Sequence, residues 1–130
     1  DAFRKLIDLV PSPNNGLTLC QGTFATMGED IASVIRYFGK RKKIFFVHFR
    51  DVRGDKWNFE ETFHDEGKTD MYEAMKTYFE VGFKGPMRPD HVPTFEGDNN
   101  DHAGYSELGP LFAIGYIKGL IEAAAKEVRP

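Results

Sequence analysis

The feature of the sequence that most constrains the fold is a repeated alternation of short apolar stretches with amphipathic helical stretches. The apolar stretches are 17–20, 43–48 and 85–90, and the stretches with helical spacing are 2–10, 31–38, 71–83 and 105–125. Alternating β and α elements are typical of a parallel sheet with right-handed crossovers. Three strands alone would leave both edges of a parallel sheet open, so the pattern favours an α/β sector of a (β/α)8 TIM barrel, about three βα units in extent.

Local signals refine this expectation. The continuous apolar run at 43–48 predicts a strand that is buried on both faces. Thr26 followed by Glu29 resembles a capping box for the helix that comes next. The stretch from Phe49 to Lys68 is rich in glycine, aspartate and histidine and predicts a long loop.

Composition excludes several classes of function. The net charge is −3, so a basic nucleic-acid-binding surface is not expected. A single cysteine excludes an internal disulfide and favours a cytoplasmic protein. No apolar run approaches the length of a membrane span, and Lys118 interrupts the last helical stretch, so no membrane partner is expected.

Each of the three predicted strands ends in a potential metal ligand. These residues are Cys20, His48 and Asp90. The carboxyl ends of barrel strands converge on one face, where βα-barrel enzymes keep their active sites. A thiolate, an imidazole and a carboxylate together form a mixed ligand set that leaves room for water or substrate. Taken singly, each has an ordinary structural explanation, but three at equivalent positions favour a metal site.

The same residues permit a second interpretation without a metal. Cys20 would be a nucleophile, His48 its base and Asp90 the group that orients the base. Thiol reactivity separates the two hypotheses, because a metal-bound thiolate is shielded until a chelator is added.

Several motifs resemble the D-mannonate dehydratase family. The similar segments are 17–23, 46–54, 61–67, 88–93 and 104–116, within a resemblance that extends from Asn15 to Ala124. The resemblance implies a sugar-isomerase-like TIM barrel that acts in hexuronate breakdown. It implies removal of water from D-mannonate to give 2-keto-3-deoxy-D-gluconate, with a divalent metal, typically Mn²⁺ and alternatively Fe²⁺. It also implies that residues 1–130 are the C-terminal part of a single barrel domain.

The resemblance also implies roles for individual residues. Cys20, His48 and Asp90 match metal ligands of the family, whose site includes a further histidine from a strand upstream of Asp1. His91 and Tyr105 match residues assigned to acid–base catalysis, which fits a dehydration that needs one base and one acid. Which of the two is the base stays open.

Two further residues are candidate substrate contacts. Arg50 could pair with the substrate carboxylate, and a surface salt bridge is the alternative. His64, in the predicted flexible loop, is either a contact made by a lid or a solvated side chain.

Two other functions compete with the dehydratase. One is a metal-dependent sugar isomerase or epimerase of the same barrel class. The other is a non-catalytic fragment that associates through its open edges with the rest of the barrel or with other copies of the chain. For the enzyme, the expected partners are a small sugar acid and further copies in a homo-oligomer.

Overall fold

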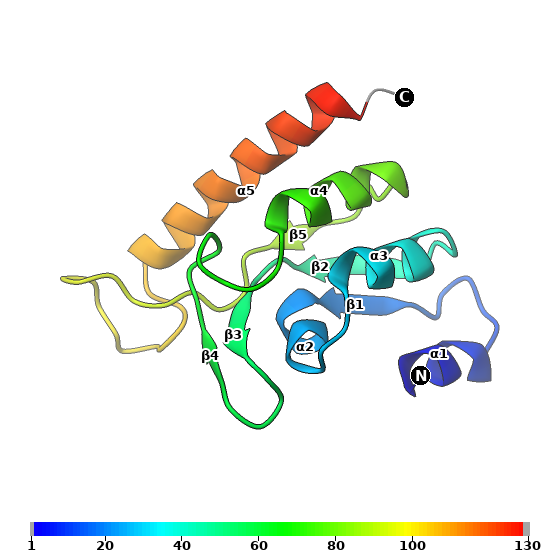
Figure 1. Ribbon diagram of the computed structural model, residues 1–130, viewed down its shortest axis with the longest axis horizontal. Helices are drawn as coiled ribbons and strands as arrows, with labels where there is room; N and C mark the ends of the chain where they lie inside the picture. Colours follow the sequence, from blue (N-terminus) through cyan, green and yellow to red (C-terminus); the bar gives the residue numbers. More distant parts are fainter. Residues whose placement is uncertain (1, 129–130) are drawn as a thin grey trace.

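The structure is a computed structural model that describes residues 2–128. A three-stranded parallel sheet forms the centre of the fold (Figure 1). Its strands are β1 (Leu17–Cys20), β2 (Ile44–His48) and β5 (Met87–Arg88), in the order β1-β2-β5. Cys20 pairs with His48, and His48 pairs with Arg88, so the three strands end almost level. The expected parallel sheet is confirmed, and its order is that of consecutive units in a (β/α)8 barrel.

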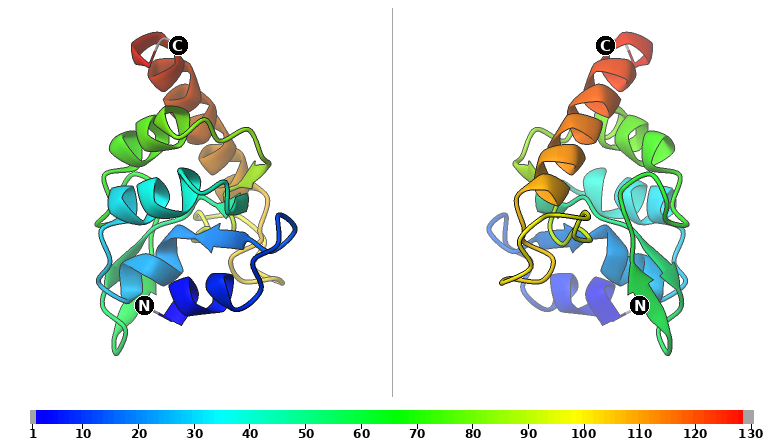
Figure 2. Two further views of the ribbon diagram at one scale, coloured as in Figure 1. Left: turned by 90° about the vertical axis from the view of Figure 1, so that its right-hand side faces the viewer. Right: turned by 90° about the vertical axis from the view of Figure 1, so that its left-hand side faces the viewer.

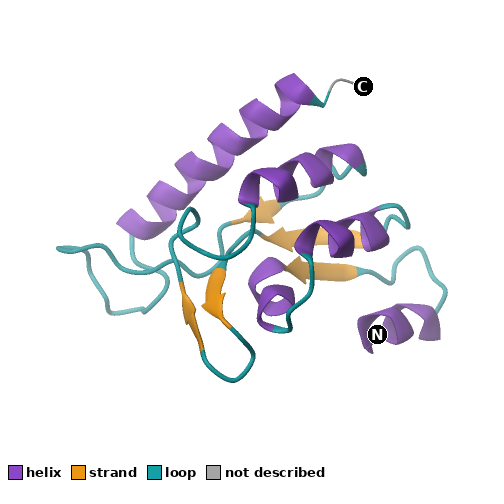
Figure 3. Cartoon of the chain, in the orientation of Figure 1, coloured by secondary structure: helices purple, strands orange, loops and turns teal. Residues whose placement is uncertain are grey.

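Helices α3 (Ile31–Gly39) and α4 (Met71–Glu80) lie over one face of this sheet (Figure 3). The other helices are α1 (Ala2–Leu9), α2 (Gln21–Thr26), which directly follows β1, and α5 (Leu108–Glu127). Helix α3 packs against α4, and α4 packs in turn against α5, whose C-terminal end lies at the top of both views in Figure 2.

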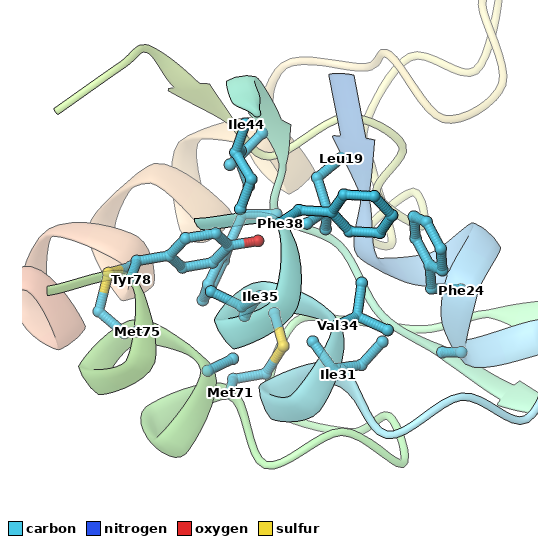
Figure 4. Close-up of a cluster of buried hydrophobic side chains, with 14 of the residues drawn as sticks. Leu19, Phe24, Ile31, Val34, Ile35, Phe38, Ile44, Met71, Met75 and Tyr78 are labelled. Atoms are coloured by element: carbon cyan, nitrogen blue, oxygen red, sulfur yellow. The ribbon is translucent and has the colours of Figure 1, made fainter. Parts of the chain in front are cut away.

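The core lies between the sheet and the α3–α4 pair. The apolar positions predicted for α3 are all buried: Ile31 and Ile35 lie on the side of α4, whereas Val34 and Phe38 lie toward Phe24 of α2 (Figure 4). Leu19 and Ile44 reach the same cluster from β1 and β2. The helical spacing therefore identified the correct buried face of α3.

The prediction that β2 is buried on both faces is wrong. Ile44 and Val47 are buried, whereas the side chain of Phe45 is 41% exposed. Within the described residues α3 and α4 lie over one face of the sheet only, so the opposite face of β2 stays partly open.

The start of α3 also differs from the expected capping box. The N-cap is Asp30, whose carboxylate accepts a hydrogen bond of 2.8 Å from the Ser33 amide. Thr26 ends helix α2 instead, and its hydroxyl donates to the Thr23 carbonyl. An aspartate directly before the helix satisfies an amide of the first turn, which Thr26 is too far away to do.

A β-hairpin occupies the region that was predicted as a loop. Strands β3 (Val52–Gly54) and β4 (Phe59–Glu61) pair antiparallel beyond the carboxyl end of β2. The buried carboxylate of Asp51 holds the base of the hairpin by accepting hydrogen bonds from the Val52 amide, the Thr69 amide and the Thr69 hydroxyl. The polar residues that suggested a loop thus make the hydrogen bonds that order it.

The third predicted strand is shorter than its apolar stretch. β5 contains only Met87 and Arg88, and Asp90 lies beyond it with φ at +65°. This left-handed conformation is tolerated better by aspartate than by most residues, and it turns the chain into the loop that follows. Helix α5 begins at Leu108, so Tyr105 belongs to that loop and not to the helix.

Helix α5 is long and apolar enough to cross a membrane by length and composition, with a mean hydropathy of 1.3 and 22% of its most apolar window buried. The sequence-based statement that no such run exists is therefore wrong. A helix that packs in the core of a soluble protein passes the same test, and Ala113, Ile117 and Ala124 of α5 are buried against the rest of the chain.

Candidate metal centre

The ends of the three sheet strands bring Cys20, His48 and Asp90 together. One ligand atom from each lies within 4.8 Å of the other two. Oδ2 of Asp90 is 3.2 Å from Nδ1 of His48 and 3.9 Å from Sγ of Cys20. Cys20 and His48 are paired in register, and the turn at Asp90 directs its carboxylate back over the strand ends.

The spacing of these atoms suits one metal ion. Ligands that bind one ion at about 2.0–2.3 Å lie roughly 3.3–3.8 Å from each other in tetrahedral geometry. The two distances to Asp90 are close to this range. Because the same carboxylate oxygen faces both other ligands, the arrangement fits a shared ion better than a relay with the carboxylate behind the imidazole.

The electrostatic environment favours the protonation states in which His48 and Asp90 can bind a metal. Burial lowers the pKa of His48, an effect that the Asp90 carboxylate opposes. For Asp90, burial alone would raise the pKa, but the hydrogen bond from Arg88 and the nearby His48 and His91 lower it below its ordinary value. A neutral imidazole and an ionised carboxylate are therefore present at neutral pH, as metal binding requires.

Arg50 lies behind the carboxylate of Asp90. Its Nε donates to Oδ2 of Asp90 at 3.1 Å, and its Nη1 lies 2.9 Å from both carboxylate oxygens of Glu61. The side chain of Arg50 is only 8% exposed, so the surface-salt-bridge interpretation is wrong. Gly22 makes room for the guanidinium, because a Cβ atom there would clash with Nη1.

A second arginine contacts the other oxygen of Asp90. Nη2 of Arg88 lies 2.6 Å from Oδ1 of Asp90 and donates to the Tyr105 hydroxyl at 3.1 Å. Arg88 thus connects the candidate ligand to one of the two candidate acid–base residues. The predicted site did not include Arg88, although the spacing Arg88-Pro89-Asp90 allows such a contact.

His91 and Tyr105 face each other beside the three candidate ligands. Their rings are 5.3 Å apart in an edge-to-face arrangement. Both line a cavity of about 390 Å³. The other residues that line it are Glu61, Val92, Pro93, Thr94, Asn100, Ala103 and Gly104. The two residues lie near opposite ends of the loop that connects β5 to α5.

His64 does not have the environment that was expected for it. Its side chain is fully buried, so the prediction of a lid contact or a solvated residue is wrong. Nε2 of His64 lies 3.2 Å from the Pro89 carbonyl, and burial lowers the pKa of the ring. The neutral ring thus contacts the backbone of Pro89, the residue before Asp90.

Sequence reasoning did not identify Glu61 or Asp51. Glu61 lies on β4 and reaches Arg50 and His91, because the hairpin folds back over the carboxyl end of the sheet. Both residues lie in the segments that resemble the dehydratase family, 46–54 and 61–67, but no local pattern marked either of them as a site residue. Only the hairpin, which depends on long-range contacts, gives them their positions.

The fold and the site together define a βα-barrel protein with a candidate mixed-ligand metal centre. The family model for D-mannonate dehydratase (UxuA) matches residues 1–129. The chain therefore belongs to the D-mannonate dehydratase family.

Individual relatives agree with this assignment. The chain is 36% identical over 125 residues to a mannonate dehydratase of Streptococcus equi subsp. zooepidemicus, covering 94% of this chain and 34% of the relative. It is 39% identical over 129 residues to a mannonate dehydratase of Thermotoga neapolitana, covering 95% of this chain and 35% of the relative. The chain thus spans about a third of the length of these relatives.

A solved structure gives the same result for the fold. The crystal structure of mannonate dehydratase from Streptococcus suis serotype 2 superimposes with a TM-score of 0.91 at 32% identity. The match covers 97% of this chain and 37% of the other. The barrel sector predicted from the alternation of strands and helices is therefore confirmed.

Proposed function

We propose that the protein to which this chain belongs removes water from D-mannonate to give 2-keto-3-deoxy-D-gluconate in hexuronate breakdown. Residues 1–130 would be the C-terminal part of its single barrel domain. The observation that carries the proposal is the convergence of Cys20, His48 and Asp90 within 4.8 Å in a member of the D-mannonate dehydratase family. A cytoplasmic homo-oligomer that binds a small sugar acid is the corresponding expectation.

The three converging side chains would hold one divalent metal, Mn²⁺ by the family resemblance and Fe²⁺ as the alternative. When bound, such a metal supplies a positive charge that stabilises negative charge developing on the substrate. Asp90 is prepared for this role by two guanidinium groups, which fix both of its oxygens, and by Arg88, His48 and His91, which lower the pKa of its carboxyl group. His48 is prepared by burial, which keeps its ring neutral.

His91 and Tyr105 would move the two protons of the reaction. Loss of water from a 2,3-dihydroxy acid requires a base for the proton next to the carboxylate and an acid for the leaving 3-hydroxyl. Both side chains reach the same cavity, and the Tyr105 hydroxyl lies beside the cationic Arg88. Either assignment of the two roles is compatible with this geometry.

Arg50 would contact the substrate carboxylate only through the part of its guanidinium that is not engaged. Nε bonds to Asp90, Nη1 bonds to Glu61, and the guanidinium also interacts with the Cys20 side chain, so little of it remains for a ligand. His64 is enclosed beneath the Pro89 backbone, so its role would be to support the site and not to bind the substrate.

The test uses the intact protein that contains this chain, loaded with Mn²⁺ and incubated with D-mannonate. The expected result is formation of the 2-keto-3-deoxy product, lost after treatment with a chelator and restored by the metal. Aldoses and ketoses are assayed in parallel. Isomerisation of these sugars without dehydration of D-mannonate would favour the isomerase, and no turnover of any sugar would favour the non-catalytic alternative.

A further inference from the structure

Glu61 is a charged residue near the candidate site to which no role has been assigned. It ends strand β4, which belongs to the hairpin that lies at the carboxyl end of the sheet (Figure 1). Its side chain is 30% exposed and lines the same cavity as His91 and Tyr105. Its neighbour Glu60 is 65% exposed and pairs with Arg53 within the hairpin. Only the second of these two adjacent carboxylates therefore faces the site.

The position of the Glu61 carboxylate is fixed by Arg50. Nη1 of Arg50 lies 2.9 Å from both carboxylate oxygens. Arg50 itself has little freedom, because it is nearly buried, bonds to Asp90 through Nε and lies against Gly22. A charge-assisted contact to a guanidinium held in this way defines the orientation of the carboxylate.

The fixed carboxylate faces one particular nitrogen of His91. Oε1 of Glu61 is 3.5 Å from Nδ1, a distance typical of an ion pair and longer than an ordinary hydrogen bond. Nε2 of the same ring points the other way and lies 3.8 Å from Oδ1 of Asp90. The Tyr105 ring lies edge to face against the His91 ring and Gly104 lies close to the Cβ atom of His91, while 41% of the side chain stays exposed.

We propose that Glu61, held by Arg50, is a positioning residue that orients the His91 ring, with Nδ1 toward Glu61 and Nε2 toward Asp90 of the candidate metal centre. This proposal rests on the proposed function for the part that concerns turnover. His91 then exchanges its reacting proton through Nε2, while the Glu61 carboxylate faces the Nδ1–H group and takes no proton itself. Carboxylates orient catalytic and metal-binding histidines in this way in other enzymes.

The first experiment measures the tautomer of His91 directly in the metal-free intact protein. Histidine labelled with ¹⁵N in its ring gives distinct NMR shifts for the two neutral tautomers, and His91→Asn identifies the signal. We expect the Nδ1–H tautomer to predominate in the wild type and to decrease in Glu61→Gln. Predominance of the Nε2–H tautomer in the wild type overturns the proposal even if the variant does not fold.

The second experiment separates positioning from folding by steady-state kinetics on the metal-loaded protein. Glu61→Gln should lower kcat by about tenfold or more and change KM by less than about twofold, the pattern of a group that acts on proton transfer. The matched control Glu60→Gln, on the same hairpin, should leave both constants and the His91 tautomer unchanged. An unchanged kcat in Glu61→Gln, or an equal loss in Glu60→Gln, contradicts the proposal.

The two experiments also distinguish failure of this proposal from failure of the proposed function. A wild-type protein that does not dehydrate D-mannonate but shows the Nδ1–H tautomer, decreased in Glu61→Gln, supports the positioning by Glu61 and overturns only the assigned reaction. An active wild type with the opposite tautomer overturns only the positioning by Glu61.

Discussion

At the scale of single residues, Asp90 is the side chain that joins most parts of the candidate site. One of its oxygens faces Cys20, His48 and Arg50, and the other contacts Arg88. The left-handed backbone at Asp90 makes this possible, because an extended backbone would continue the strand away from the other ligands. The residue type was predictable from the sequence, whereas its two arginine partners were not.

The lowered pKa of Asp90 leads to a prediction about stability. The folded pKa lies below the unfolded value of about 3.9, so the ionised carboxylate stabilises the fold above that pH, and this contribution is lost as the pH falls through the folded pKa. We expect Asp90→Asn to destabilise the metal-free intact protein at pH 6 by an amount that shrinks below about pH 4. Urea unfolding of both proteins across this range measures it. A difference that grows on acidification would contradict the assigned sign.

The acid–base residues make a separate prediction. In the intact enzyme, His91→Asn and Tyr105→Phe should each lower kcat about a hundredfold, the usual scale for the loss of a general acid or base. Metal content should stay unchanged, because neither side chain belongs to the three converging ligands. Steady-state kinetics and metal analysis on the same preparations measure both quantities. Near-normal turnover in either variant removes that residue from the chemistry.

At the scale of elements, the sequence was informative where one local rule determined the structure. Apolar spacing identified the buried face of α3 because that helix packs on one side only. The same reasoning failed for the β3–β4 hairpin, whose order comes from Asp51 and Thr69, which are distant in sequence. It also failed for β5, where Asp90 leaves the strand early to form the site. The hairpin and β5 were thus misjudged because they depend on tertiary contacts, whereas the start of α3 was misjudged on a local signal.

Helix caps allow a quantitative prediction at this scale. Asp70 caps α4 by accepting a 2.8 Å hydrogen bond from the Glu73 amide. Asp70→Ala should lower the free energy of unfolding of the intact protein by about 1 kcal/mol, the usual value for loss of an N-cap side chain. Asp65→Ala, at an exposed position in the preceding loop, should have little effect. Equal losses in the two variants would show that the cap does not contribute.

At the scale of the whole molecule, the described chain has the surfaces of an incomplete barrel. Strands β1 and β5 are at the edges of the sheet, and α5 exposes apolar side chains along much of its length. The largest of these are Leu108, Leu111, Phe112, Ile114 and Ile121. Open edges and exposed apolar faces favour association.

Residues 1–130 expressed alone should therefore associate rather than stay monomeric. Light scattering on the purified fragment measures its mass directly. A monodisperse monomer of 14.8 kDa that unfolds cooperatively would show that the fragment is a self-contained domain. In that case the barrel-sector account of its stability would be incorrect.

The most direct test of the central claim is the optical spectrum of the intact protein loaded with Co²⁺ in place of its own metal. A thiolate bound to Co²⁺ produces an intense charge-transfer band in the near ultraviolet. If Cys20, His48 and Asp90 hold one metal, the wild type should show this band at one bound ion per chain, and Cys20→Ser should lose it. Bound Co²⁺ without the band, or a band that persists in Cys20→Ser, would contradict the site.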